Sequence, residues 1–414
     1  MLKNTLTRKG HLALAVGGAA RWASRAADLG DGAVIGGLVS MTLDRSILRQ
    51  LGAGRRTVIV TGTNGKSTTT KMVRVALSTL GMVASNAEGA NMDAGLVAAL
   101  AANRNNMLAA LEVDELHVPH IADALDPAVI VLLNLSRDQL DRVGEIHHLE
   151  QRLRTGLARH PKAIVVANCD DVLMTSVAYD CPDVVWVAAG CGWASDSVSC
   201  PRSDGVIMRE KGHWYSTGTD FKRPTPQWWM ESGSLCGPAG VSIPMRLSLP
   251  GAVNRGNAAQ AVVAAVSLGA DPILAMAAVA RVDEVDGRYR TLRIGDRTAR
   301  ILLAKNPAGC QEALSMIDKT AAGLVIAVNG RSPDGEDLSW LWDVDVSHIK
   351  GLPVVASGER ATDLSVRLRY AGVSGTVEPD LIAAMTSCPE GHVEVVVNYS
   401  AFMQLMRKLR RRYG

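Results

Sequence analysis

Short apolar runs alternate with longer segments of helical periodicity along most of the chain. The β-branched run at residues 57–60 leads into a glycine-containing turn, and residues 68–80 then place Met72, Val73 and Leu80 on one side of a predicted helix. Further β-rich runs follow at residues 107–111, 129–133 and 163–167, and segments of helical character separate them. Strands that alternate with helices are typical of α/β proteins, so we predict a mostly parallel sheet covered on both faces.

The pattern changes between about residues 186 and 243, where Gly, Ser, Pro, Trp and Cys cluster and the alternation is lost. We interpret this stretch as an irregular subdomain inserted into the α/β fold. An Ala- and Val-rich helix is predicted at residues 257–268, and a second α/β section follows it. Its four predicted buried strands are residues 300–303, 323–328, 353–356 and 393–397.

These boundaries predict three parts of the chain. Residues 1–56 form a helical lead-in segment, residues 57–290 a central domain that carries the insert, and residues 291–414 a C-terminal Rossmann-like α/β domain. Within the lead-in, an apolar stretch ends at Ala20 and is followed at once by Arg21 and Arg25. This favours an amphipathic first helix over a signal peptide.

Composition narrows the possible classes of function. The 414 residues carry a formal net charge of +3, which gives no electrostatic argument for a nucleic-acid partner. No apolar run approaches the ~20 residues that span a bilayer. Seven cysteines scattered over the chain do not predict a disulfide framework. We therefore expect a cytoplasmic protein that is at most peripheral to the inner face of the membrane.

A phosphate-binding loop is predicted directly after the strand at residues 57–60. The loop and the first helical residues are Gly62, Thr63, Asn64, Gly65, Lys66, Ser67 and Thr68. Glycines allow the backbone to wrap around phosphates, and a helix N-terminus offers free N–H groups and the positive end of the helix dipole. We expect Lys66 to meet the terminal phosphates of ATP and the Ser67 hydroxyl to bind Mg²⁺.

The sequence TGTNGKST in this loop resembles the nucleotide-binding loop of the Mur ligase and folylpolyglutamate synthetase superfamily. The resemblance implies a central ATPase domain of the Mur ligase type and roles for further residues. Glu112, at the end of a predicted strand, corresponds to the family's Mg²⁺ ligand. Asn254 and Asn257 correspond to contacts with the adenine base. Arg288 corresponds to an arginine that closes on phosphate at the domain boundary.

Two departures from the family pattern concern magnesium. Residues 134–142 resemble the N-x-x-x-D-H-x-D motif, but Gln139 stands where most members have a metal-binding histidine. Many members also use a carbamylated lysine to bridge a second Mg²⁺, and the spacing here points near Arg154 instead. Either one Mg²⁺ suffices, or His147, His148 or water takes that role.

Along nearly its whole length, the chain resembles one branch of the family, the MurT subunits of lipid II isoglutaminyl synthase. Only about 56 residues precede the first strand, too few for the extra domain of Mur enzymes that take UDP-linked precursors. The segments that carry the resemblance are residues 86–92, 137–145, 220–224, 305–309 and 334–345.

This resemblance implies ATP-dependent amidation of the D-glutamate α-carboxyl in the lipid II stem peptide, giving D-isoglutamine through an acyl phosphate. Ammonia would come from a separate glutaminase subunit, GatD, in a heterodimer. No self-contained Cys-His-Glu glutaminase signature surrounds any of the seven cysteines. Two alternatives stay open: a ligase that joins an amino acid or glutamate to its substrate, as the Mur and folylpolyglutamate relatives do, and a non-catalytic nucleotide-binding scaffold.

The resemblance also points to a catalytically required aspartate in residues 342–345. We prefer Asp343, which could orient ammonium or accept its proton, with Asp345 or His348 assisting. The competing interpretation is that the neighbouring tryptophans are core or interface residues and that both aspartates form turns.

The insert in this branch commonly holds a four-cysteine zinc ribbon. The corresponding positions here are Cys200, Ser203, Ser216 and Thr219, so one thiol remains. Ser and Thr are poor zinc ligands, and we therefore predict that zinc is absent. The alternative is a rebuilt site, which would combine Cys200 with Cys181, Cys191, Cys236 and His213.

Overall fold

The computed structural model describes residues 6–27, 32–86, 89–137, 145–283, 289–331, 334 and 337–413. The chain divides into two compact units. Unit 1 comprises Met1–Leu135 and Glu145–Asp283, and unit 2 comprises Ser136–Gly144 and Glu284–Gly414. Each unit contains its own sheet and its own hydrophobic core.

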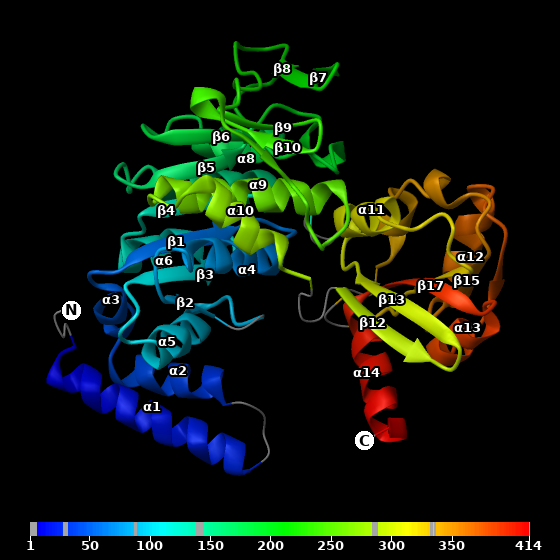
Figure 1. Ribbon diagram of the computed structural model, residues 1–414, viewed down its shortest axis with the longest axis horizontal. Helices are drawn as coiled ribbons and strands as arrows, with labels where there is room; N and C mark the ends of the chain where they lie inside the picture. Colours follow the sequence, from blue (N-terminus) through cyan, green and yellow to red (C-terminus); the bar gives the residue numbers. More distant parts are fainter. Residues whose placement is uncertain are drawn as a thin grey trace. The chain divides into compact units, whose positions relative to one another are not determined.

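Unit 1 is built on a nine-stranded sheet (Figure 1) with the order β11-β10-β9-β6-β5-β4-β1-β3-β2. Strands β2 to β6 and β1 pair in parallel, β9 joins β6 in parallel, and β10 and β11 close the edge in antiparallel pairing. The strands are β1 (Arg56–Thr61), β2 (Val83–Ser85), β3 (Leu108–Glu112), β4 (Val129–Leu132), β5 (Ile164–Asn168), β6 (Val184–Ala188), β9 (Trp228–Glu231), β10 (Ser234–Cys236) and β11 (Ser242–Pro244).

Helices cover both faces of this sheet, which explains why the central strands β1, β3, β4 and β5 are buried at nearly every position and mostly apolar, without a regular alternation of apolar and polar residues. Side chains such as Ile59, Leu111 and Ile130 face one helical layer and share a core with it. That layer contains α3 (Ile47–Gly52), α5 (Asp93–Ala102), α6 (Val118–Leu125), α7 (Glu145–Leu157) and α8 (Val172–Ala178). Three helices that contact one another form the other layer: α4 (Lys66–Leu77), α9 (Ala252–Ser267) and α10 (Pro272–Ala280).

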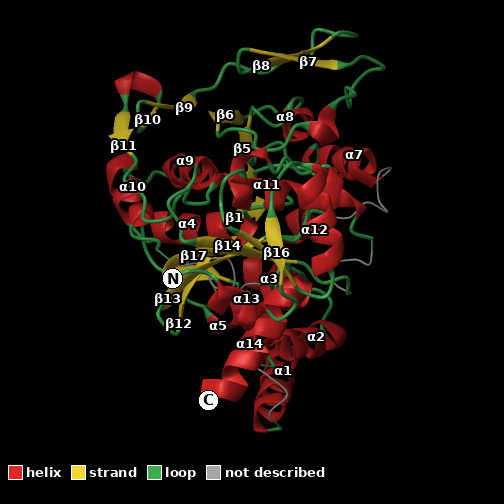
Figure 2. Cartoon of the chain, turned by 90° about the vertical axis from the view of Figure 1, so that its right-hand side faces the viewer, coloured by secondary structure: helices red, strands yellow, loops and turns green. Residues whose placement is uncertain are grey.

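The predicted insert is more regular than its sequence suggests. It supplies β9, β10 and β11 to the main sheet and a separate hairpin of β7 (Ile207–Glu210) and β8 (His213–Ser216). Figure 2 shows this hairpin at the end of unit 1 opposite to α1 and α2. A small core of Cys200, Ile207, Trp214 and Phe221 packs on Val172 of α8 and holds the hairpin to the sheet layers.

The lead-in segment is helical. Helices α1 (Arg8–Ala26) and α2 (Ala33–Leu43) pack side by side, and α2 also contacts α5. A Cβ added to Gly17 would lie only 2.4 Å from the backbone oxygen of Gly36, so glycine permits the close approach of the two helices. No helix in the described ranges combines the length and the apolar character that crossing a membrane requires.

Unit 2 contains a six-stranded sheet with the order β12-β13-β17-β14-β15-β16, parallel except for β12. Its strands are β12 (Tyr289–Ile294), β13 (Arg297–Leu303), β14 (Gly323–Ala327), β15 (Val354–Ser357), β16 (Gly375–Val377) and β17 (Gly391–Val397). Alternate strand residues enter two separate cores, one with α11 (Pro307–Ser315) and α12 (Ala361–Tyr370), the other with α13 (Leu381–Ser387) and α14 (Tyr399–Tyr413). The second α/β section is therefore a sheet covered on both faces.

Candidate functional site

The predicted phosphate loop connects the buried strand β1 to helix α4, which begins at Lys66. Gly62 has a φ of 143°, and a Cβ at this position would come within 2.8 Å of the Leu133 Cβ. Gly65 has a φ of 83°, in the left-handed region that favours glycine. The strand, the tight turn and the helix N-terminus thus have the arrangement that binds phosphate groups.

The Lys66 ammonium is held inside the loop. Its Nζ atom donates to the backbone oxygen of Gly62 at 2.6 Å and pairs with Glu115 Oε2 at 3.1 Å. Both side chains are buried, with exposed fractions of 7% and 9%. Glu115 lies three positions after Glu112, but the sequence could not predict its contact with Lys66 because 49 positions separate the two residues.

Asn134, which lies just after β4, forms hydrogen bonds with the backbone of the phosphate loop. Its backbone oxygen accepts from the Thr63 N–H at 2.9 Å, and its side-chain oxygen accepts from the Asn64 N–H at 3.0 Å. Its Nδ2 atom donates back to the Asn64 backbone oxygen at 3.0 Å. Asn134 is the first residue of the segment that resembles the N-x-x-x-D-H-x-D motif. That resemblance drew attention to the residue in the sequence but did not predict that it holds the phosphate loop.

Glu112 lies at the last position of β3, in register with Val60 of β1. The buried carboxylate accepts from Asn91 Nδ2 at 3.3 Å, and Asn86 clamps the Glu112 backbone through both its N–H and its oxygen. Neither asparagine was assigned a role from the sequence. A carboxylate beside the strand that leads into the loop, together with the Ser67 hydroxyl at the start of α4, offers the oxygen donors that Mg²⁺ prefers.

The two asparagines predicted on the adenine side lie near the N-terminus of α9 and are buried. Asn257 packs against the phosphate loop, since a Cβ on Gly65 would lie 3.0 Å from its Oδ1 atom. Asn254 donates to the Pro250 backbone oxygen at 2.6 Å. The structure therefore brings Asn257 to the loop, across 192 positions of sequence. Arg288, Gln139 and the aspartates at 138 and 141 lie outside the described residues.

In unit 2 the two candidate aspartates have different surroundings. Asp345 accepts from the Ser347 N–H at 2.8 Å and from its hydroxyl at 2.9 Å, and these bonds lower the pKa of Asp345. The Asp343 side chain is 41% exposed and lies 3.6 Å from the Arg137 Nη2 atom, in the short segment grouped with unit 2. Both residues are exposed, but Asp345 accepts hydrogen bonds within its own turn, whereas Asp343 pairs with Arg137.

Arg367 of α12 holds the backbone around Asp343. Its Nε atom donates to the Leu341 oxygen at 2.9 Å and its Nη2 atom to the Val344 oxygen at 2.8 Å. The same guanidinium lies 5.3 Å from the ring centroid of Trp342, whose side chain is exposed, while Trp340 is buried in the core. One side chain therefore sets the position of the segment that carries the candidate aspartate.

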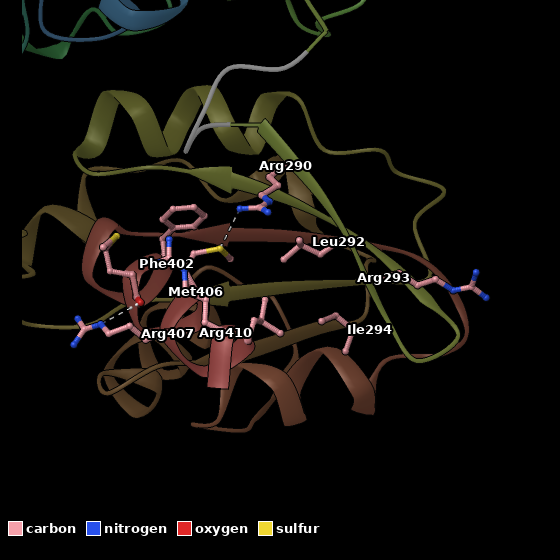
Figure 3. Close-up of a pocket in the computed structure, with 10 residues that line it drawn as sticks. Arg290, Leu292, Arg293, Ile294, Phe402, Met406, Arg407 and Arg410 are labelled. Carbon is pink, nitrogen blue, oxygen red and sulfur yellow. Dashed lines mark hydrogen bonds between the residues drawn. The ribbon is translucent and has the colours of Figure 1, made fainter. Parts of the chain in front are cut away.

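A hollow in unit 2 has a volume of about 580 Å³ and lies between β12 and α14 (Figure 3). Its apolar wall includes Leu292 and Phe402. Four arginines surround it, and within the described ranges none of them forms an ion pair with a carboxylate: Arg290, Arg293, Arg407 and Arg410. Guanidinium groups beside an apolar wall suit a ligand that combines negative charge with apolar surface.

The four zinc-ribbon positions still form two facing turns. The Ser203 and Ser216 hydroxyls lie 3.3 Å apart, and the Gly205 and Gly218 N–H groups donate to them. Burial would raise the pKa of the Cys200 thiol, but hydrogen bonds from Ser203 and Ser216 lower it below its ordinary value. Within the described ranges no cysteine belongs to a group of three potential metal ligands. The absence of zinc itself stays a prediction.

Comparisons with known proteins agree with this geometry. A family profile for the Mur ligase middle domain matches residues 60–265, and one for the MurT ligase C-terminal region matches residues 303–402. The lipid II isoglutaminyl synthase (glutamine-hydrolyzing) subunit MurT of Streptococcus pneumoniae is 29% identical over 381 residues, 83% of each chain. The subunit of the same name from Staphylococcus aureus is 26% identical over 422 residues and covers 95% of this chain and 96% of its own.

Solved structures show the same fold. A pseudomurein peptide ligase type C from Methanothermus fervidus superposes with a TM-score of 0.65 at 18% identity, covering 89% of this chain and 81% of its own. MurF from Acinetobacter baumannii gives a TM-score of 0.63 at 16% identity, with coverage of 91% and 81%. The predicted α/β architecture of the Mur ligase type is thereby confirmed. The chain belongs to the Mur ligase family of ATP- and magnesium-dependent ligases, in its MurT branch.

Proposed function

We propose that the chain is the synthetase subunit that amidates the D-glutamate α-carboxyl of the lipid II stem peptide to D-isoglutamine. The observation that carries this proposal is the similarity to MurT subunits along 95% of the chain, joined to a complete phosphate loop in unit 1. The names of those relatives describe a subunit of a glutamine-hydrolysing lipid II isoglutaminyl synthase.

A carboxylate is a poor electrophile, so the reaction first needs activation. One carboxylate oxygen forms a bond to the γ-phosphorus of ATP while the bond to the leaving ADP breaks, which gives an acyl phosphate. Ammonia then attacks the acyl carbon, phosphate leaves with the electron pair of the C–O bond, and nitrogen loses its extra proton. Charge neutralisation and positioning are the protein's main contributions to phosphoryl transfer.

The residues described above divide these tasks. Lys66 neutralises the terminal phosphates, and Ser67 and Glu112 would hold Mg²⁺, which shields the phosphate charge when bound. Asn254 and Asn257 contact the adenine side, and Arg288 closes on phosphate. Asp343 of unit 2 orients ammonium or accepts its proton, because among the described residues it accepts no hydrogen bond within its own turn, whereas both oxygens of Asp345 accept from Ser347; the nearby Arg137 guanidinium lies 3.6 Å from the Asp343 carboxylate.

Ammonia is supplied by a partner glutaminase subunit, GatD, in a heterodimer. Free ammonia is scarce at neutral pH because most of it is protonated, so hydrolysis of glutamine next to the synthetase overcomes this shortage. The lipid-linked substrate brings the complex to the inner face of the membrane only peripherally.

The test is reconstitution with the neighbouring glutaminase, followed by mass spectrometry of lipid II incubated with ATP and glutamine. The expected product carries an amide in place of one carboxylic acid per stem peptide. Lys66→Ala should abolish the product and leave the complex assembled, and Asp343→Asn should remove amidation while ATP binding persists. Full activity of Asp343→Asn would overturn the assignment of that residue.

One alternative is an amino-acid or glutamate ligase of the Mur or folylpolyglutamate type. ATP turnover separates the two functions, because a synthetase subunit of this kind turns over with ammonium and an amino-acid ligase with an amino acid. Turnover with amino acids but not with ammonium would replace the proposed function by this alternative.

A further inference from the structure

Three side chains outside the proposed ATP site gather at the N-termini of two helices. Asp93 is the first residue of α5, His117 is the N-cap residue of α6, and His120 lies in the first turn of α6. Asp93 Oδ2 lies 2.9 Å from His117 Nδ1, and Asp93 Oδ1 lies 2.9 Å from His120 Nε2. The three potential ligand atoms all lie within 4.8 Å of one another.

The fold explains why these residues meet. Strands β2 and β3 pair in parallel, so the segments that follow them emerge at the same edge of the sheet. Backbone hydrogen bonds fix both segments there: the Asp114 N–H donates to the Asn91 oxygen at 3.1 Å, and the His117 N–H donates to the Asp114 oxygen at 2.9 Å. The three side chains therefore project from a backbone that is already ordered by other contacts.

We propose that Asp93, His117 and His120 bind a divalent transition-metal ion, with Zn²⁺ as its representative. Two imidazoles and one carboxylate are a common ligand set for open zinc and iron sites, in which water or a substrate atom completes the coordination. Metal–ligand distances of about 2.0–2.2 Å place neighbouring donor atoms roughly 3.3 Å apart, so the two distances of 2.9 Å between Asp93 and the histidines need only a small widening. The His120 side chain is 51% exposed, which leaves a path for the ion.

This site differs in chemistry from the proposed magnesium site. Imidazole nitrogens favour Zn²⁺, Ni²⁺ or Cu²⁺, whereas Mg²⁺ prefers oxygen ligands such as those of Glu112 and Ser67. The two sites are nevertheless connected, because Asp93 directly follows the segment whose Asn86 and Asn91 hold Glu112. A bound ion would fasten the start of α5 to the start of α6 and so steady that segment.

The experiment uses the full chain after treatment with a chelator. Titration with Zn²⁺ by calorimetry, and with Co²⁺ by its visible absorption bands, should show one site that raises the thermal midpoint of the protein. In His117→Ala/His120→Ala this site should be lost, with affinity lower by about a hundredfold or more. Its far-ultraviolet circular dichroism should match that of the parent protein.

A matched control is His160→Ala. His160 Nε2 also lies near a carboxylate, 3.0 Å from Asp123 Oδ1, but this pair has only one histidine and is shared with Arg159. The control should bind Zn²⁺ and Co²⁺ as the parent protein does. Equal binding by the parent and the double variant would overturn the proposal, as would an absence of binding by the parent.

A second measurement keeps the proposal testable if the double variant fails to fold. Crystals of the parent protein soaked in Zn²⁺ should show an anomalous scattering peak between Asp93, His117 and His120. A peak only at other positions, or none, would count against the site. Because neither measurement depends on ATP or on amidation, the inference can fail while the proposed function stands.

Discussion

At the scale of single residues, buried charges define the phosphate loop. Lys66 and Glu115 are almost fully removed from solvent, and each is the other's charged partner. Removing one partner of such a pair leaves an uncompensated buried charge, which costs far more than removing both. The stability of the loop therefore depends on Glu115 as well as on Lys66, the lysine of the sequence motif.

A double-mutant cycle measures this dependence. We expect Lys66→Met and Glu115→Gln each to lower the free energy of unfolding by about 3 kcal/mol. The double variant should lose clearly less than the sum of the two single changes, because it leaves no unpaired charge. Urea denaturation of the four proteins gives the coupling energy, and strictly additive losses would show that the contact contributes little.

Asp171 predicts a pH dependence of stability. It caps α8 by accepting from the Met174 N–H at 2.8 Å, and burial raises the pKa of Asp171 from 3.8 to about 6. The folded protein thus binds this proton more tightly than the unfolded chain does. The resulting stabilisation is complete below pH of about 4 and is lost as the pH rises through about 6, by roughly 3 kcal/mol.

Comparison with Asp171→Asn isolates this effect, because asparagine also caps helices and does not titrate. The difference in free energy of unfolding between the parent protein and the variant should fall from pH 4 to pH 7. Asp380→Asn is a control of opposite sign, since the Lys408 hydrogen bond lowers the pKa of Asp380, the cap of α13. If the difference in free energy of unfolding between the parent protein and Asp171→Asn does not change with pH, the prediction is wrong.

At the scale of elements, helix α12 supports the turn that carries Asp343. Arg367 donates to two backbone oxygens of that turn and packs on Trp342, so one helix position determines where the carboxylate lies. Reactive groups need such support because small displacements of a positioned side chain reduce the rate strongly.

Arg367→Ala should therefore lower kcat for amidation by on the order of tenfold to a hundredfold, with the KM for ATP unchanged. Arg367→Lys should restore only part of the rate, because one ammonium reproduces the paired donors and the stacking poorly. Arg369→Ala, on the exposed face of the same helix, is the matched control and should keep normal kinetics. An effect on KM for ATP, or none on kcat, would argue against a positioning role.

At the scale of the whole molecule, the proposed chemistry is divided between two units. Unit 1 holds the phosphate loop and the candidate magnesium ligands, and unit 2 holds Asp343 and the arginine-lined hollow. Under the proposed function both parts are needed, because activation requires ATP and capture requires ammonia and the acceptor. Under the proposed function the acceptor joins anionic and apolar groups, as a lipid-linked precursor does, and we expect the arginines and apolar wall of this hollow to bind it.

Charge reversal in this hollow tests that assignment. Arg293→Glu/Arg407→Glu should raise the KM for the lipid-linked acceptor by about tenfold or more, because two favourable charges become repulsive. ATP binding should stay unchanged, and raised salt should weaken acceptor binding by the parent protein more than by the variant. Unchanged KM for the acceptor would remove the hollow from the substrate path.

Local sequence was sufficient for the main elements. The run at residues 129–133 corresponds to β4 at Val129–Leu132, and the predicted C-terminal strand at 393–397 lies within β17 at Gly391–Val397. Buried strands need contiguous apolar residues and a phosphate loop needs adjacent glycines, so both leave a readable pattern. The insert was predicted less well, because its short strands β9 to β11 gain their order from pairing with the main sheet.

The sequence by itself determined the α/β class, the phosphate loop from Gly62 to Ser67 and the resemblance to Mur ligases, because each depends on residues that are neighbours along the chain. Only the tertiary structure decided that Glu115 meets Lys66, that Asn86 and Asn91 hold Glu112, and that Asp93 meets two histidines. These partners come from separate loops that converge at one edge of a parallel sheet. Strand order, which no local pattern encodes, determines which loops become neighbours.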